Sequence, residues 1–291
     1  WGGPLAGGTL LTVVGHGFAD YSSKVAGIRW QGLRCQLSGS LTNATYQHDA
    51  STAQCLSPPD IPAVAAAPAT ASRALKLTLN GQTSGDSLTQ SSVAFTYYNE
   101  SALALARLHP LGGPAAGGTR LHIHLEDNTL HQNLGGLACR FEMPAAPPGR
   151  GGRRHGSRQI EVAAAVGQCE DPSANGWRSP CTGPRMITCR TPPLDTDVHV
   201  DVRVDVSLNG QNFSRTGRTF TYYPSNVLVT SIQPSGGPTE GATVVRVAAT
   251  GALDLGDPRC RFGDINPTVE ATVEDGASLV CVAPAHWRAR A

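Results

Sequence analysis

The sequence predicts an all-β chain of tandem immunoglobulin-like β-sandwiches that form an elongated rod, and three observations support this. The 291 residues include 33 glycines and 21 prolines, together about 19% of the chain against roughly 12% in an average protein. Apolar and polar residues alternate in many short runs, which favours strands over helices. Four sequence phrases recur in the same order along the chain, which indicates a repeated small domain of about seven strands.

Each copy of the repeat begins with a Gly/Pro turn that leads into an alternating strand. The phrase reads GGPLAGGTLLTVV from Gly2, GGPAAGGTRLHIH from Gly112 and GGPTEGATVVRVA from Gly236. Apolar residues recur there at a spacing of two, so they share one strand face. Runs of the same kind that end in Pro predict a further strand before the second and third turns, at 102–110 and 227–234. The first copy begins without that strand, so we expect the parent chain to extend beyond this segment.

Cysteines stand in the second and third phrases of every copy. The two phrases lie about 20 residues apart in the first and third copies and about 50 apart in the second, where an insertion of about thirty residues holds two more cysteines. Eight cysteines in separated pairs favour disulfides over zinc ligands. The repeat therefore predicts four disulfides, Cys35–Cys55, Cys139–Cys189, Cys260–Cys281 and, within the insertion, Cys169–Cys181.

The fourth phrase predicts a β-hairpin in the first two copies. An alternating strand ends in Leu-Asn-Gly-Gln at 79–82 and again at 208–211. Asn-Gly is the strongest short signal for a type I′ turn, because both central residues of that turn need a positive φ. A final strand follows at 93–99 and at 219–224. The third copy has neither the turn nor the final strand.

Taken together, the four phrases resemble the IPT/TIG family of immunoglobulin-like domains found in plexins and transcription factors. The cysteine-bearing form is most similar to the tandem arrays of fibrocystin-like cell-surface proteins. The resemblance implies an immunoglobulin-like fold in a mechanical or adhesive setting, without catalytic residues. It predicts three domains: 1–101, which lacks its N-terminal strand; 102–225, with a disulfide-bearing insertion at about 144–185; and 226–291, which is incomplete at its C-terminus.

Charge, cysteine pairing and sequons predict an extracellular or cell-surface location. The net charge is +1, which argues against nucleic acid as a partner. No run of 18 apolar residues is present to span a bilayer, so we expect no direct membrane insertion of this segment. N-glycosylation sequons stand at Asn43, Asn99 and Asn212. The expected partners are neighbouring immunoglobulin-like domains of the same chain and other extracellular structural proteins or glycans.

An arginine-rich stretch in the insertion is a candidate anion or glycan site. Its basic side chains are Arg150, Arg153, Arg154 and Arg158. A flexible basic loop can bind sulfated or carboxylated polysaccharide through bidentate guanidinium contacts. The alternative is a solvated Gly/Arg loop without a ligand.

Two further polar clusters have a structural interpretation. The histidines 122, 124 and 131, with two acidic residues between them, could hold a metal ion, but we expect solvent-facing strand positions and no metal or other cofactor. Asp201 and Asp205 flank Arg203 on an alternating strand, which predicts a charged outer face that limits edge pairing.

No catalytic motif is present: the sequence contains no GxSxG, HExxH or P-loop, so we expect no enzyme activity. Short connections at 98–101 and 223–226 predict domains that dock semi-rigidly. The sequence therefore predicts a segment of a large extracellular structural glycoprotein, a stalk or filament component at the cell surface such as the axial protein of an algal flagellar hair. The alternative is a ligand- or polysaccharide-binding ectodomain of a cell-surface receptor.

Overall fold

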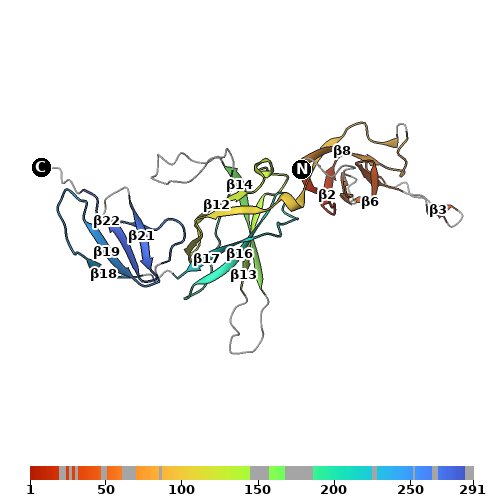
Figure 1. Cartoon of the computed structure of the whole chain (residues 1–291). Helices are drawn as coiled ribbons and strands as arrows, with labels where there is room; N and C mark the ends of the chain where they lie inside the picture. The colour runs from red at the N-terminus through yellow and green to blue at the C-terminus, as the bar shows by residue number, and fades with distance from the viewer. Residues whose placement is uncertain are drawn as a thin grey trace, which may run out of the picture.

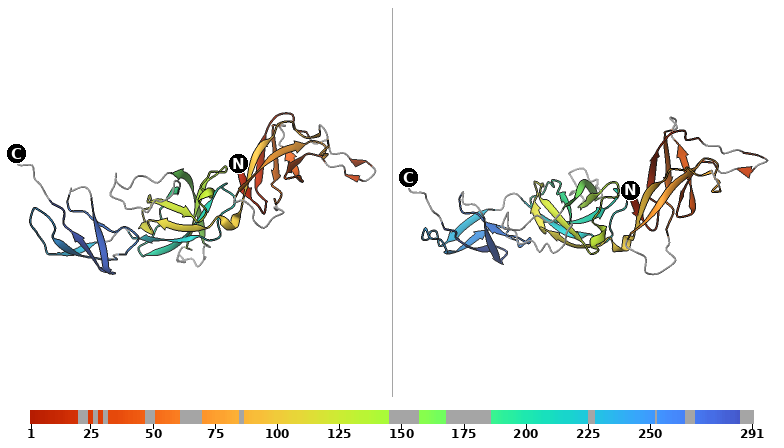
Figure 2. Two further views of the ribbon diagram at one scale, coloured as in Figure 1. Left: turned by 45° about the horizontal axis from the view of Figure 1, so that its top comes forward. Right: turned by 90° about the horizontal axis from the view of Figure 1, so that it is seen from above.

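The computed structural model describes residues 1–19, 24–25, 28–29, 32–46, 51–60, 70–84, 87–144, 157–167, 186–224, 228–251, 253–263 and 268–285. Its strands form three large sheets that follow one another along an elongated molecule (Figures 1 and 2). Domains 1, 2 and 3 denote residues 1–101, 102–225 and 226–291, each of which holds one of these sheets. Helical structure in the described ranges is confined to short 3-10 turns, among them η2 (Glu100–Ala102) and η3 (Asn128–Leu130). The predicted all-β class is confirmed.

Domain 1 is a sheet of seven strands that folds over on itself. In sheet order the strands are β1 (Gly2–Pro4), β9 (Val93–Tyr98), β8 (Thr70–Thr78), β5 (Arg34–Leu37), β6 (Ser40–Tyr46), β7 (Thr52–Leu56) and β2 (Leu10–Val14). The first half of β6 pairs with β5 and its second half with β7, so β6 is the strand at which the sheet turns into two layers. A small hairpin of β3 (Lys24–Val25) and β4 (Ile28–Arg29) stands apart.

Domain 2 repeats this arrangement with eight strands. In sheet order they are β10 (Leu105–His109), β12 (Arg120–Leu125), β15 (Met186–Arg190), β14 (Arg158–Gly167), β13 (Ala138–Met143), β16 (Val200–Ser207), β17 (Arg218–Tyr223) and β11 (Gly112–Pro114). Here β14 pairs with β13 and then with β15, as β6 does with its two neighbours. The strand predicted within 102–110 is β10, which pairs antiparallel with β12.

Domain 3 contains five strands of the same pattern. In sheet order they are β18 (Val229–Gln233), β19 (Val244–Ala249), β22 (Ser278–Val282), β21 (Val269–Asp275) and β20 (Arg259–Cys260). The strand predicted within 227–234 is β18, and it pairs with β19 as β10 pairs with β12. The strand at which this sheet turns into two layers, called the folded strand below, is β21, which pairs with β20 and β22.

The described disulfides join the two layers of each domain at the same place. They are Cys35–Cys55, Cys139–Cys189 and Cys260–Cys281, with Cα–Cα distances of 6.4, 6.5 and 6.3 Å. In every pair the two cysteines lie on the strands that flank the folded strand β6, β14 or β21. These are the pairs that the repeat predicts for the six cysteines. The predicted pair Cys169–Cys181 lies outside the described residues.

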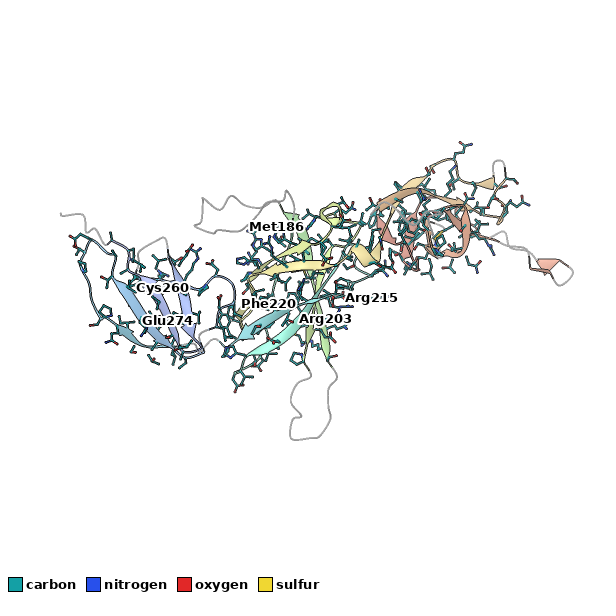
Figure 3. The ribbon with its side chains drawn as sticks, viewed as in Figure 1. Met186, Arg203, Arg215, Phe220, Cys260 and Glu274 are labelled. Carbon is teal, nitrogen blue, oxygen red and sulfur yellow. A yellow bond between two sulfur atoms is a disulfide. The ribbon has the colours of Figure 1, made fainter. Side chains whose placement is uncertain are left out.

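The hydrophobic core of each domain lies between its two layers. Domain 2 has the largest core, in which Phe141 and Phe220 are fully buried; Figure 3 labels Phe220 within that domain. Phe220 and Tyr222 meet edge to face with ring centroids 5.1 Å apart, and Phe95 and Tyr97 do the same in domain 1 at 4.9 Å. The described part of domain 3 buries far less apolar surface than the other two domains.

The Gly/Pro turn recurs together with the Cys-x-x-Pro-Pro phrase because the two segments pack on each other. Gly117 has a φ of +75°, and a Cβ there would lie 2.7 Å from the backbone of Pro192 and Pro193. The Gly118 N–H donates a hydrogen bond to the Thr191 carbonyl oxygen at 2.8 Å. Burial raises the pKa of Tyr222 to about 12, and its hydroxyl donates to the Pro192 carbonyl oxygen at 2.7 Å. This hydrogen bond joins the final strand of the domain, β17, to the Pro-Pro segment on which the Gly/Pro turn packs.

The prediction of type I′ hairpins is wrong. At Asn80-Gly81 and Asn209-Gly210 only the glycines have positive φ, at 75° and 74°. Each asparagine instead uses its side-chain Oδ1 to accept the backbone N–H two residues later, from Gln82 at 3.1 Å and from Gln211 at 3.0 Å. This is an Asx turn, which the asparagine side chain makes as readily as it makes a tight hairpin. The Asn-Gly pairs therefore open longer loops between the strands.

Candidate functional site: the junction between domains 1 and 2

The junction brings the first residues of domain 1 against a loop of domain 2. The Gly2 N–H donates a hydrogen bond to the Leu134 carbonyl oxygen at 2.9 Å. A Cβ at Gly2 would lie 2.8 Å from the Leu134 side chain, so this approach requires glycine. The Trp1 ring lies against Gly135, whose φ is +110° and where a Cβ would overlap the ring. Both sides of the contact thus depend on the absence of a side chain.

A second loop of domain 2, residues 208–214 (the Asn209 loop), binds the open edge of β2. Gln211 accepts the Leu10 N–H through Oε1 at 2.8 Å and donates from Nε2 to the Leu10 carbonyl oxygen at 3.0 Å. Its carboxamide thereby makes the pair of bonds that a neighbouring strand would make. Asn209 donates from Nδ2 to the Gly2 carbonyl oxygen at 3.0 Å and to Thr9 Oγ1 at 3.4 Å. Side-chain amides therefore join the two domains through backbone atoms.

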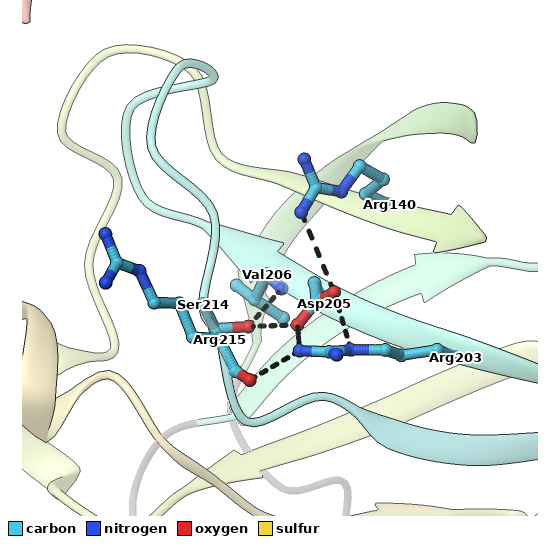
Figure 4. A network of polar contacts seen from close by, with 6 residues as sticks. All are labelled: Arg140, Arg203, Asp205, Val206, Ser214 and Arg215. Carbon is cyan, nitrogen blue, oxygen red and sulfur yellow. Dashed lines mark hydrogen bonds and ion pairs between the residues drawn. The ribbon is translucent and has the colours of Figure 1, made fainter.

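An ionic network supports the Asn209 loop from below (Figure 4). Asp205 is buried on β16 and accepts the Ser214 hydroxyl at 2.9 Å, which places it directly under the loop. The Arg203 Nε lies 3.1 Å from Asp205 Oδ2, and Arg140 Nη2 lies 3.7 Å from the same oxygen. The Arg140 guanidinium also stacks 4.1 Å above the centroid of the Phe213 ring. The buried carboxylate is thus compensated by two cations and one hydroxyl.

The predicted charged outer face on this strand is confirmed for its residues, but the prediction that it limits edge pairing is wrong. The strand β16 lies between β13 and β17, so it is not an edge, and Asp205 shares the outer face with Arg203 but is buried at 3% exposure because the loop that carries Ser214 covers it. Asp201 is exposed and accepts the Thr221 hydroxyl at 2.6 Å, as an outer-face residue would. Alternation predicts which residues share a face, but it does not reveal that a loop covers part of the outer face and buries the carboxylate there.

A groove of about 870 Å³ runs along the junction. Its polar walls come from both domains, with Glu100 and Ser101 on one side and Arg140, Glu142 and the Asn209 loop on the other. Arg215 lies at the end of domain 2 next to domain 1 (Figure 3) and also lines the groove. The groove carries basic and acidic side chains in similar number, so it has no strong preference for an anion or a cation.

The junction between domains 2 and 3 uses a similar backbone contact, shifted by one residue, without an equivalent of the Asn209 loop in the described residues. The Leu111 N–H donates to the Leu255 carbonyl oxygen at 2.7 Å, and a Cβ at Gly112 would lie 2.5 Å from the Leu255 side chain. A pocket of about 480 Å³ stands beside Thr119 and Tyr223 at this junction. Leu255 thus has the position at this junction that Leu134 has at the first.

Comparison with known families identifies the first domain. The family model described as IPT/TIG domain matches residues 1–97. Residues 1–97 form an IPT/TIG domain. The resemblance that the four phrases predict is confirmed there.

Relatives of known name extend the similarity beyond this IPT/TIG domain. The chain is similar to Plexin-A3 of Rattus norvegicus and of Mus musculus, each at 24% identity over 286 residues, 97% of this chain. It spans about 12% of the length of these relatives. Among solved structures it is similar to the full extracellular region of Plexin A4, at 19% identity with a TM-score of 0.46, over 99% of this chain and 20% of that one.

The sequons differ in what surrounds their asparagines. Asn43 is exposed on β6 of the IPT/TIG domain. Asn99 is partly exposed and accepts the Ser101 N–H through Oδ1 at 3.0 Å at the start of η2. Asn212 belongs to the Asn209 loop, where its Oδ1 accepts the Thr9 hydroxyl at 3.1 Å. Two of the three sequons therefore lie at the junction.

Most of the predicted arginine site lies outside the described residues. Arg150, Arg153 and Arg154 are not described, and Arg158 is the exposed first residue of β14. The structure therefore does not bring the four arginines together or separate them. No helix in the described ranges is long and apolar enough to cross a membrane.

The prediction that the three histidines occupy solvent-facing strand positions is only partly correct. His122 and His124 are half-buried between the buried residues of β12. His131 is buried at 1% exposure rather than solvent-facing, because its Nε2 accepts the Leu125 N–H at 3.2 Å. Within the described part of the chain no three His, Cys, Asp or Glu residues gather as metal ligands.

We expect His124 to make domain 2 less stable below neutral pH. Burial, followed by the Arg107 guanidinium and the histidines 131, 122 and 109, lowers the pKa of His124 to about 4. The unfolded chain takes up a proton near pH 6.5. Between pH 6.5 and 4 the unfolded state therefore binds more protons, and stability falls as the pH falls. Because the ring is only half-buried, we expect a loss on the order of 1 kcal/mol.

Urea unfolding of domain 2 at pH 7, 5.5 and 4 measures this effect. His124→Gln removes the titrating ring and should flatten the pH profile. An equally steep profile in the variant would contradict the assignment to His124.

Proposed function

We propose that residues 1–291 are a segment of the extracellular region of a plexin-like cell-surface receptor, and that its domains act as non-catalytic spacers and binding surfaces. One observation carries this proposal: the similarity to Plexin-A3 runs over 286 residues and therefore through all three domains. We extend the IPT/TIG assignment to domains 2 and 3 because they repeat the folded strand, the flanking disulfide and the Gly/Pro turn of domain 1. The disulfides and sequons support an extracellular location.

The similarity to Plexin-A3 of rat and mouse favours a receptor ectodomain over the stalk or flagellar-hair filament that the sequence first suggests. A polysaccharide ligand for the arginine stretch of the insertion stays a prediction. Salt-sensitive glycan binding that is lost in Arg153→Ala/Arg154→Ala would support it.

Cell-surface labelling tests the proposed function. Antibodies raised against the folded chain should label intact, unpermeabilised cells that express the parent protein. The parent should then dissolve in mild detergent as discrete particles. Detergent-resistant fibres that carry the epitope would favour the filament, and labelling only after permeabilisation would contradict an extracellular role altogether.

In a receptor, the junction between domains 1 and 2 would fix the angle between these domains and so the direction in which the chain extends from the cell surface. The amide contacts of Asn209 and Gln211 to domain 1, each worth about 0.5–1.5 kcal/mol, act together with the packing of Trp1 on Gly135. A junction with several such contacts holds one preferred angle, because bending must break them together. A receptor segment of this kind presents its surfaces at a fixed spacing.

Gln211→Ala is expected to loosen this junction without unfolding either domain. The side chain is exposed and makes its two described hydrogen bonds to Leu10 of the other domain, so its loss should weaken the docking by about 1–2 kcal/mol. Small-angle scattering should then report a broader distribution of overall dimensions. Gln82→Ala is the matched control, because Gln82 occupies the same place in the repeated phrase and its exposed side chain has no hydrogen-bond partner among the described residues. Equal scattering from both variants would contradict the role of Gln211.

A further inference from the structure

The contact between domains 1 and 2 consists of two complementary halves that both recur in the sequence. One half is the loop with Leu-Asn-Gly-Gln, present in domains 1 and 2. The other half is the Gly/Pro turn with its Thr and the first residue of the next strand, present in all three domains. At the observed junction the loop of domain 2 meets the turn of domain 1. Domain 1 therefore carries a loop half of its own that this contact does not use.

The loop of domain 1, residues 79–84 (the Asn80 loop), begins with the same Asx turn as the Asn209 loop. Asn80 Oδ1 accepts the Thr78 hydroxyl at 2.9 Å, as Asn209 Oδ1 accepts the Ser207 hydroxyl at 3.1 Å. The residue two positions before each asparagine also makes an isolated bridge across its loop, Thr78 with Leu88 in domain 1 and Ser207 with Phe213 in domain 2. The Asn80 loop thus holds its asparagine in the same Asx turn that presents Asn209 to domain 1.

The Asn80 loop faces away from domain 2. Tyr98 pairs with Thr70 at the end of the sheet next to η2 and domain 2, whereas Leu75 pairs with Val93 at the opposite end, where the loop begins. Asn80 and Gln82 are exposed, while Asn209 is buried at 6% exposure under domain 1. Among the described residues neither Asn80 Nδ2 nor the Gln82 carboxamide has a hydrogen-bond partner.

We propose that the Asn80 loop is a docking surface for the Gly/Pro turn and first strand of another repeat in the same polypeptide. Asn80 Nδ2 would bind the first glycine carbonyl of that repeat, and the Gln82 carboxamide would bind the backbone N–H and C=O of the residue after its Thr. We commit to a repeat in the same polypeptide because both observed junctions join consecutive repeats. The proposal rests on junction geometry and holds for a receptor or a filament alike.

In domain 3 the Gly/Pro turn and the first residue of the next strand are exposed to solvent. Val244, the equivalent of Leu10, is 60% exposed, and a Cβ at Gly236 would meet nothing within 4 Å. The Thr243 carbonyl oxygen accepts the Ala283 N–H at 2.8 Å, as the Thr9 oxygen accepts the Ser57 N–H in domain 1. The chain thus presents a loop half at one end and a turn half at the other, as consecutive members of one array would.

A chain with one added repeat tests the proposal. Leu111 and Trp1 hold equivalent positions before the Gly/Pro turn, so residues 1–111 followed by residues 2–291 place a complete domain 1 ahead of the natural chain. The second copy of the Asn80 loop then faces the turn of the first copy. Single-molecule energy transfer between dyes on the two copies of domain 1 should show one narrow distance population, as at the natural junction between domains 1 and 2.

Substitutions in the second copy identify the loop as the cause. Gln82→Ala together with Asn80→Ala should broaden the new distance distribution at least twofold, while the distance across the natural junction stays unchanged. Thr83→Ala, an exposed neighbour in the same loop, should leave both distributions unchanged. A distribution that is broad with the intact loop, or unaffected by the double substitution in a chain that keeps its disulfides, overturns the proposal.

Discussion

Replacing Cys139 and Cys189 together by alanine is expected to lower the free energy of unfolding of domain 2 by about 4 kcal/mol, because the bond closes a loop with a sequence separation of 50 residues. Both cysteines are buried, at 0% and 4% exposure, so the variant also leaves small voids in the core. Domain-resolved hydrogen exchange in urea measures the loss, since the three domains need not unfold together.

The corresponding bond of domain 1 provides the control. Cys35 and Cys55 are separated by only 20 residues, so their joint replacement should cost about 3 kcal/mol, less than the loss in domain 2. Domain 3 should respond to neither double substitution. A smaller loss in domain 2 than in domain 1 would contradict the view that these bonds act mainly by restricting the unfolded chain.

Gly117→Ala is expected to destabilise domain 2 by about 2–4 kcal/mol. Its φ of +75° costs an alanine about 1–2 kcal/mol. The added Cβ would also lie 2.7 Å from the backbone of Pro192 and Pro193, which cannot move without breaking the Gly118 hydrogen bond to Thr191. Overpacking of this kind adds about 1–3 kcal/mol. Thermal unfolding followed by circular dichroism reports the combined effect.

Gly118→Ala separates the two contributions. Gly118 has nearly the same φ, +79°, but a Cβ there meets nothing within 4 Å. It should therefore lose only the conformational part, about 1–2 kcal/mol. Equal losses in the two variants would show that the packing of the Gly/Pro turn on the Pro-Pro segment adds nothing.

The repeat made most of the fold predictable. The strands before the second and third turns and the pairing of six cysteines follow from sequence phrases at matching distances, because equivalent residues in homologous domains occupy equivalent strands. The Asn-Gly turns were mispredicted because asparagine can satisfy backbone donors with its side chain as well as adopt a positive φ. The burial of Asp205 was not predicted because a buried carboxylate is recognisable only once Arg140, Arg203 and Ser214 are seen around it.

The junction was harder to predict than the domains. Leu134 lies in a loop that no phrase marks, and its contact with Gly2 depends on the angle between two domains. One signal in the sequence points to the Asn209 loop: Gln211 repeats Gln82 after Asn-Gly, although the turn itself uses only the side chain of the asparagine. A residue that recurs without a role inside its own domain is a candidate for contact with the next one.

The account depends most on the claim that domains 1 and 2 form a docked pair with one orientation. Single-molecule energy transfer between dyes at exposed positions, one on β2 of domain 1 and one on Arg158 of domain 2, measures this directly. The account predicts one narrow distance population in 150 mM salt that persists at higher salt, since the junction contacts are backbone and amide hydrogen bonds rather than ion pairs. A broad or multiple distribution in the unmodified chain would contradict it.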